Sequence, residues 1–319
     1  MCSFISTRQN DTNETKITDF ILLGINGPHT LKMVLFSLFL VVHITTVCVN
    51  LVIIALYLQS QQLKSPMYFF LSHLSSSDIL LSTCIVPNLL DALLRNGKNM
   101  SLGGCLAQLL ATGTSTGAEC YLLTAMSYDR YLAICNPLHY MKMMSPKLCV
   151  HLVAWSWFLS FLICLVIVLL LAQLDFCRCN VLDYIYCDFS PLLAISCKNS
   201  LALEITTMVL SIPIILLPLG FIISTYIYIG LAILRISSSV GRKKTFSTCS
   251  SHLTVVCTYC GILITKYTVP IGGQSLTMNK AISLLYTVGT PLLNPIIYSF
   301  RNQEIRAALK KWMTRRVGY

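Results

Sequence analysis

The chain has 319 residues, of which 55% are hydrophobic and only 11% are charged, and its mean hydropathy is +0.72. Soluble domains carry about 25% charged residues, so this composition excludes a water-facing globule of this size and predicts a membrane protein. The net charge of +11 does not indicate nucleic-acid binding, because no basic stripe interleaved with aromatic residues is present. The positive residues sit in short loops, where they indicate membrane topology.

The first segment, residues 1–30, is polar and shows no cleavable signal peptide. Asn10 in NDT and Asn13 in NET are acceptor sequons for N-glycosylation. Two sequons just before the first apolar run predict an extracellular, glycosylated N-terminus, with the first membrane helix acting as an uncleaved insertion signal.

Seven apolar runs follow, each long enough to cross a bilayer, which takes about 20 residues. Prolines inside several of them are compatible with membrane helices, because neighbouring helices satisfy the freed backbone groups. No internal repeat or second domain is present. We therefore predict an all-α membrane protein, a seven-transmembrane helix bundle over residues 31–300. The runs lie near 31–58, 66–90, 101–135, 148–172, 199–235, 243–268 and 277–299.

Loop charge orients the predicted bundle. One side carries thirteen Lys and Arg against a single acid, Glu304, whereas the other side carries nine against eight. The positive-inside rule places the first side in the cytoplasm, and an odd number of spans then leaves the N-terminus outside, in agreement with the sequons. We expect a multi-pass plasma-membrane protein. The thirteen are Lys64, Lys142, Lys147, Arg235, Arg242, Lys243, Lys244, Arg301, Arg306, Lys310, Lys311, Arg315 and Arg316.

The tail, residues 301–319, follows the last span. Ile305, Ala308, Leu309 and Trp312 recur at helical spacing on one face, with cations around them. This pattern predicts a short amphipathic C-terminal helix on the cytoplasmic side, with the lipid bilayer as its partner.

Six cysteines are predicted to lie outside, in an oxidising environment where disulfides form. Spacing alone does not choose among their pairings. They are Cys2, Cys105, Cys177, Cys179, Cys187 and Cys197.

One motif would indicate an enzyme. GTSTG at 113–117 fits the G-x-S-x-G pattern and would make Ser115 an acyl-transfer nucleophile. That chemistry needs a strand–turn–helix context, whereas this stretch lies midway through an apolar helical run. Small residues in membrane helices allow close packing or open a cavity. No metalloprotease H-E-x-x-H motif, P-loop or paired Cys-x-x-Cys motif occurs, so we expect neither an enzyme nor a metal site.

Two carboxylates lie inside spans, Asp78 in the second and Glu119 in the third. Buried acids need partners or must be protonated. In a secondary transporter they would form a cation or proton relay. In a receptor they would hold a cation or a hydrogen-bonded network, and as a purely structural pair they would be protonated. No cofactor is expected apart from a sodium ion that could bind near this pair.

Longer motifs carry a family resemblance. MSYDRYLAIC (126–135) with TPLLNPIIY (290–298) resembles the Asp-Arg-Tyr and Asn-Pro-x-x-Tyr signatures of rhodopsin-like G-protein-coupled receptors. LKSPMYFFLSHLSSSD (63–78), KTFSTCSSHLTVV (244–256) and SLLYTVGTPLLNPIIYSFRNQEIRAAL (283–309) resemble vertebrate odorant receptors, within them the large tetrapod class. The resemblance implies a receptor for small volatile odorants that signals through the olfactory-type stimulatory G protein to raise cyclic AMP.

The resemblance also implies residue roles. The outer cysteines would pair as Cys105–Cys187 and Cys177–Cys197, leaving Cys179 additional. Asp129 would pair with Arg130 in the resting receptor, and the freed guanidinium would meet the G protein. The residues implied for activation and G-protein coupling are Asp129, Arg130, Tyr131, Tyr226, His252, Asn294, Pro295 and Tyr298.

The predicted ligand site begins on the third span. Its outer half places Thr112, Gly113, Thr116 and Gly117 on one helical face, where glycines would leave room and threonines offer hydroxyls without charge. By the resemblance this face looks toward other spans, and the set predicts neutral, partly apolar ligands. Cys260 stands where the family usually has Tyr, and Tyr184 replaces a family His, so no copper site is carried over. The partners across the bundle would be Ser211, Cys260, Leu263, Tyr267 and Thr287.

Two other functions stay open. A secondary transporter would use Asp78 and Glu119 as coupling residues, but seven unequal spans without repeats argue against its usual paired halves. A non-olfactory small-molecule G-protein-coupled receptor is the other alternative.

Overall fold

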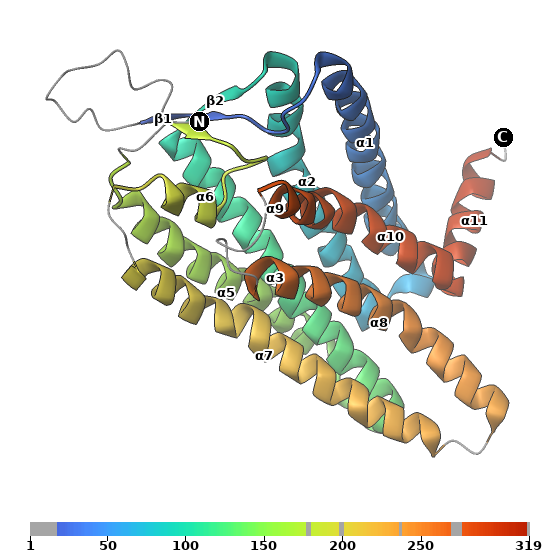
Figure 1. Cartoon of the computed structure of the whole chain (residues 1–319). Coiled ribbons are helices and arrows are strands. Elements are labelled where there is room, and N and C mark those ends of the chain that lie inside the picture. Colours follow the sequence, from blue (N-terminus) through green and yellow to red (C-terminus); the bar gives the residue numbers. More distant parts are fainter. Residues whose placement is uncertain (1–17, 177–179, 198–200, 236–237, 269–275, 318–319) are drawn as a thin grey trace, which may run out of the picture.

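The computed structural model describes residues 18–176, 180–197, 201–235, 238–268 and 276–317, and these form a long bundle of helices (Figure 1). Each predicted span corresponds to a helix, and the last one is divided by a π-helical turn, η3 (Leu285–Gly289). The helices of the bundle are α1 (His29–Gln59), α2 (Pro66–Arg95), α3 (Leu102–Cys135), α5 (Pro146–Ala172), α7 (Leu201–Leu234), α8 (Ser239–Thr268), α9 (Leu276–Leu284) and α10 (Thr290–Arg301).

Helix ends follow local chemistry. Pro66 and Pro146 open α2 and α5 at the first turn, where a missing N–H costs nothing. Ser101 caps α3 by accepting a hydrogen bond from the Gly104 N–H at 3.1 Å. Helix α2 ends where Asn96 takes the left-handed conformation, with φ of 57°. Short helices α4 (Tyr140–Met143), α6 (Phe189–Ala194) and η2 (Gln61–Leu63) lie in the connections.

Five segments of the described chain are long and apolar enough to cross a membrane: α1, α2, α5, α7 and Leu276–Ser299. They present large apolar side chains outward, and Leu217 on α7 is 65% exposed. Such faces need lipid, because soluble monomers rarely expose contiguous apolar patches of this extent. A predominantly helical, multi-pass membrane protein is thus confirmed, whereas the count of seven spans stays a prediction.

Helix α3 lies at the centre of the bundle and contacts α2, α5, α7 and α8. Its buried residues include many polar ones, among them Gln108, Thr112, Ser115 and Glu119. A helix surrounded by other helices can carry these groups without showing them to lipid. Hydropathy alone therefore does not identify α3 as a span, although it runs through the whole bundle (Figure 1).

A small three-stranded sheet lies at the end of the bundle where α3 begins. The prediction of an all-α fold did not include it. β1 (Asp19–Leu22) pairs antiparallel with β2 (Lys98–Ser101) and parallel with β3 (Val181–Leu182). The sheet ties residues 18–22, predicted as part of a polar tail, to the connections after α2 and α5. Phe20 and Leu22 of β1 are fully buried, so this part of the segment belongs to the folded bundle.

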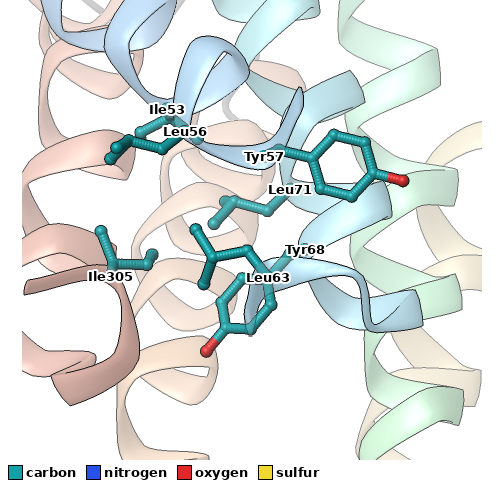
Figure 2. Close-up of a pocket in the computed structure, with 7 residues that line it drawn as sticks. All are labelled: Ile53, Leu56, Tyr57, Leu63, Tyr68, Leu71 and Ile305. Atoms are coloured by element: carbon teal, nitrogen blue, oxygen red, sulfur yellow. The ribbon is translucent and has the colours of Figure 1, made fainter. Parts of the chain in front are cut away.

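The tail forms helix α11 (Gln303–Val317), as predicted. Its apolar face is turned toward α1 and η2, because Ile305 and Ala308 are buried and α11 contacts both elements. Figure 2 shows Ile305 facing Ile53, Leu56 and Leu63 across a hollow of about 10 Å³. The hollow holds no more than one water molecule, so this is a packing contact.

Candidate functional site

A cavity of about 940 Å³ opens between α3, α5, α7, α8 and α9, beneath the connection that contains β3 and α6. Ligand pockets in proteins have volumes of about 300–1,000 Å³ and are lined mainly by apolar side chains. Apolar residues such as Ile167, Ile212 and Leu263 form most of this wall. Six of the predicted ligand residues line it: Thr112, Gly113, Thr116, Ser211, Leu263 and Thr287.

The hydroxyls in the wall are already donating. Thr116 donates to the Thr112 carbonyl at 2.7 Å, Ser211 to Thr207 at 2.7 Å, and Thr287 to Ser283 at 2.7 Å. Each hydroxyl proton is thus held by its own helix, while the oxygen keeps acceptor capacity. These groups suit a ligand that donates a hydrogen bond better than one that accepts.

Two predicted ligand residues, Gly117 and Cys260, are placed differently. Gly117 faces α5, since a Cβ there would lie 2.7 Å from Ser160 Oγ, and neither it nor Cys260 lines the cavity. Gly113 lines the cavity but also meets α5, where a Cβ would come within 2.8 Å of Cys164 Sγ. Helix α5 therefore packs into the space beside both glycines, although Gly113 still lines the cavity. The side chain of Tyr267 lies outside the described residues.

The outer end of the cavity is charged. Lys266 of α8 forms an ion pair with Asp188 at 3.0 Å and also donates to the Tyr186 hydroxyl. Asp188 accepts further bonds from Tyr186 at 3.0 Å and from the Phe189 N–H at 2.9 Å. Both members of the ion pair line the cavity, and their side chains are only 11% and 13% exposed.

Tyr184 closes the same end. Burial, and then the nearby Asp188 carboxylate, raise the pKa of its phenol above the ordinary value. The neutral hydroxyl lies 2.7 Å from Ser283 Oγ on α9, which joins the outer connection to the bundle.

A disulfide fixes this connection. Cys105 at the start of α3 is bonded to Cys187, with 5.4 Å between the Cα atoms, as the resemblance implied. Gln108, one turn further along α3, accepts from the Cys187 N–H at 2.9 Å. Asp188 is therefore held against the end of α3. Cys197 is also disulfide-bonded, whereas Cys177, Cys179, Asn10 and Asn13 lie outside the described residues.

The opposite end of α3 carries a second ion pair. Asp129 is fully buried and accepts from Arg130 Nε at 2.9 Å and from the Tyr140 hydroxyl at 2.8 Å. Burial, and then the Asp129 carboxylate, raise the pKa of Tyr140, which keeps its proton available for this bond. Tyr226 of α7 stacks on His252 of α8 and is hydrogen-bonded to it.

The remaining residues predicted for activation lie nearby or in the middle of the bundle. Tyr131 packs edge-on against Tyr228 of α7, with ring centroids 6.0 Å apart. Asn294 of α10 donates to Asp78 at 3.1 Å. Pro295 follows it inside α10, and Tyr298 is completely buried.

Asp78 and Glu119 are both buried and close enough for their charges to repel. Neither oxygen of Glu119 has a hydrogen-bond partner among the described residues. The neighbouring hydroxyls of Ser77 and Tyr259 donate instead to the backbone carbonyls of Ser115 and Thr116. Burying a carboxylate without a partner is costly unless a proton or a cation neutralises it.

Comparison with known proteins decides the family. The sequence profile described as olfactory receptor matches residues 36–316. The chain is 42% identical over 299 residues to human olfactory receptor 11A1, with 94% of each chain covered. It is 42% identical over 306 residues to rat olfactory receptor 1, covering 96% of this chain and 98% of the relative. Human olfactory receptor 6C3 is 40% identical over 307 residues, covering 96% and 99%.

The chain belongs to the olfactory receptor family. This olfactory receptor is thus a G-protein-coupled receptor of the plasma membrane, from a family of receptors rather than of enzymes, with odorants as its general class of ligand. Membership of a receptor family favours signalling over the secondary transport considered above.

Sequence reasoning missed the charged end of the cavity in this olfactory receptor. Lys266 was not among the predicted site residues, although it follows the apolar run GILIT inside the sixth predicted span. An ionisable residue in such a run is a functional hypothesis by default, and this signal could have identified it. Asp188, Tyr186 and Tyr286 carried no comparable signal, because only the folded connection brings them to the cavity.

Proposed function

We propose that this olfactory receptor binds small, neutral, volatile ligands in the cavity beneath β3 and α6. The cavity itself carries the proposal: about 940 Å³ of mostly apolar space, with a few fixed polar groups. Volatile molecules are small and largely apolar, and this lining offers them burial with little polar surface to desolvate.

We further propose that ligand binding activates an olfactory-type stimulatory G protein and raises cyclic AMP. Thr116 in the cavity wall and Arg130 at the inner end lie on one uninterrupted helix, α3. Fourteen residues separate them, which is about 21 Å along the axis. A ligand that binds one arrangement of α3 better than another shifts the population of both ends together. Release of Arg130 from Asp129 would then expose the guanidinium to the G protein.

The orientation is part of the proposal. The cavity end would face the outside, in agreement with the disulfide there, and α11 with its basic residues would face the cytoplasm. The bundle would then cross the membrane seven times. A tag on the N-terminus should stain intact cells, and a tag after Tyr319 should stain only permeabilised cells. Staining of intact cells by the C-terminal tag would refute this arrangement.

For the inner carboxylates we propose neutralisation by a shared proton or by a sodium ion between Asp78 and Glu119. The support is the Glu119 carboxyl group, both of whose oxygens lack partners in the described part of the chain. Carboxylate oxygens and the Asn294 amide oxygen would suit such an ion.

The binding site can be tested with two matched serines of α7. Ser211 lines the cavity, whereas Ser224 is exposed on the outside of the same helix, and both donate to the carbonyl four residues earlier. We expect Ser211→Phe to abolish the cyclic AMP response to an odorant panel, because the ring occupies the cavity. Ser224→Phe should respond like wild type at equal surface expression. Equal responses from both variants would place the ligand elsewhere.

A further inference from the structure

The Lys266 ammonium is the most strongly donating group on the wall of the cavity. In addition to its ion pair with Asp188 and its hydrogen bond to the Tyr186 hydroxyl, the ammonium lies close to two aromatic rings. It is 5.2 Å from the centre of the Tyr186 ring and 5.3 Å from the centre of the Tyr286 ring. The two rings and the carboxylate fix the ammonium at the outer end of an otherwise apolar space. A donor held this firmly loses little entropy when a ligand binds to it.

Among the described residues that line the cavity around this donor, acidic side chains outnumber basic ones. The described residues that line the cavity include three carboxylates, Asp183, Asp188 and Glu204, and one ammonium, Lys266. Asp183 is neutralised from outside the lining by Lys280 at 2.6 Å. Asp188 and Glu204 therefore still outnumber Lys266, so a carboxylate ligand would meet repulsion here. A neutral acceptor would meet none.

We propose that Lys266 is the specificity-determining residue, and that the receptor selects neutral molecules bearing a carbonyl acceptor, namely aldehydes, ketones and esters. This inference rests on the proposed function and names its ligand class. The ammonium donates to the carbonyl oxygen while it stays paired with Asp188, and the carbon chain extends along the apolar wall toward Thr116. A charge-assisted hydrogen bond is about twice as strong as a neutral one.

The other polar groups do not compete for this role. The hydroxyls of Thr116, Ser211 and Thr287 donate to their own helices, so they are poorly placed to recognise an acceptor.

The site is joined to α3 by one tyrosine. Tyr286, whose ring lies beside the Lys266 ammonium, is hydrogen-bonded through its hydroxyl to Thr116 Oγ1. A carbonyl that draws on Lys266 therefore changes the surroundings of a side chain bonded to the helix that ends in Asp129 and Arg130. The same residue that selects the ligand is thus connected to the proposed switch.

The test compares octanal, 2-octanone, octane, octanoic acid and octylamine, which share one chain length and differ in their polar group. Cyclic AMP is recorded in cells expressing wild type or a variant, normalised to surface expression. For wild type we expect responses to the aldehyde and ketone only. Lys266→Met should raise the half-maximal concentration of both by about tenfold or more. Lys266→Gln, which keeps a neutral donor, should lose less.

Asp188→Asn supplies the opposite change. Asn caps helices as well as Asp does, so the bond from the Phe189 N–H is kept. The substitution removes the carboxylate that is paired with Lys266, so the lining acids no longer outnumber this cation, and octanoic acid should become an agonist. Lys280→Met is the matched control, because it breaks the neighbouring ion pair with Asp183 without changing a lining cation. It should leave the ranking of the five compounds as in wild type.

The outcomes separate the two claims. Unchanged carbonyl potency in Lys266→Met, or continued silence of Asp188→Asn toward octanoic acid, overturns the role of Lys266 and leaves the proposed function standing. If wild type responds equally to octane and to octanal, the role of Lys266 is likewise overturned and the proposed function still stands. A receptor that reaches the surface and answers no compound of this panel or of a wider odorant panel refutes the proposed function and this inference together.

Discussion

The hydrogen bond from Tyr140 to Asp129 offers a direct test of the proposed switch formed by Asp129 and Arg130. Asp129 is fully buried and depends on Arg130 and on the Tyr140 hydroxyl, 2.8 Å away, for its hydrogen bonds. Tyr140 belongs to the short helix α4 in the connection after α3. Tyr140→Phe removes one hydroxyl and leaves the ring in place, so it weakens the resting arrangement with little effect on packing.

The size of the effect follows from the charge on Asp129. A hydrogen bond to a charged group contributes about 1.5–3 kcal/mol. Tyr140 is half-buried, so we take the lower end, about 1.5 kcal/mol, which is roughly a tenfold change in an equilibrium constant. A receptor with about 1% of its molecules active would then have about 10% active without ligand.

The assay is basal cyclic AMP in cells without odorant, divided by surface expression. We expect Tyr140→Phe to raise it about tenfold and Arg130→Ala to abolish the odorant response while keeping the receptor at the surface. Tyr228→Phe is the control, since this tyrosine is exposed on α7 and has no part in the Asp129 network. Basal signalling in Tyr140→Phe equal to that of the control would refute the reasoning.

Three further substitutions test other parts of the structure. Cys105→Ser should abolish surface expression, because losing a native disulfide costs about 2–5 kcal/mol, whereas Cys48→Ser, an exposed free thiol of α1, should not; normal staining of Cys105→Ser would contradict this. Gly117→Leu should lower surface expression sharply, since its Cβ would lie 2.7 Å from Ser160 Oγ. Gly220→Leu, with open space around it, serves as the control, and equal expression of the two variants would contradict this prediction. Glu119→Gln should make odorant potency independent of sodium concentration if an ion binds there, and a sodium dependence that persists in the variant would exclude Glu119 as its ligand.

The spans could be predicted because lipid imposes a simple rule on each segment separately. Every helix that contacts lipid must be apolar over about 20 residues, whatever its neighbours are. The helices that begin at Pro66, after Ser101 and at Pro146 do so for equally local reasons. The sheet could not be found in this way, because β1 pairs with strands about 80 and 160 residues away, and two to four residues carry no periodicity.

The cavity wall was predicted in part. Helical spacing correctly placed Thr112, Gly113 and Thr116 on one face, since that is a property of one helix. Spacing does not tell which neighbour fills the space beside a glycine. Ser160 of α5 occupies the space beside Gly117, and Cys164 occupies the space beside Gly113. The missing side chains of the two glycines therefore allow α3 and α5 to pack closely.

The two buried ion pairs differ in what they connect, and this difference suits their proposed roles. Asp129 and Arg130 are neighbours on one helix, so their separation requires a side-chain movement and does not unfold any element. Lys266 and Asp188 instead join α8 to a connection that the Cys105–Cys187 disulfide holds against α3. A buried ion pair adds little net stability, since desolvation offsets its attraction, so neither pair is needed mainly to hold the fold together.

A carbonyl ligand that shares the Lys266 ammonium would weaken the ion pair between Asp188 and α8. Helix α8 also carries His252, the hydrogen-bond partner of Tyr226 near the other end of the bundle. In this proposal the ligand would alter one contact between α8 and the connection fixed by the disulfide, and α8 and α3 would carry that change to the residues around Arg130.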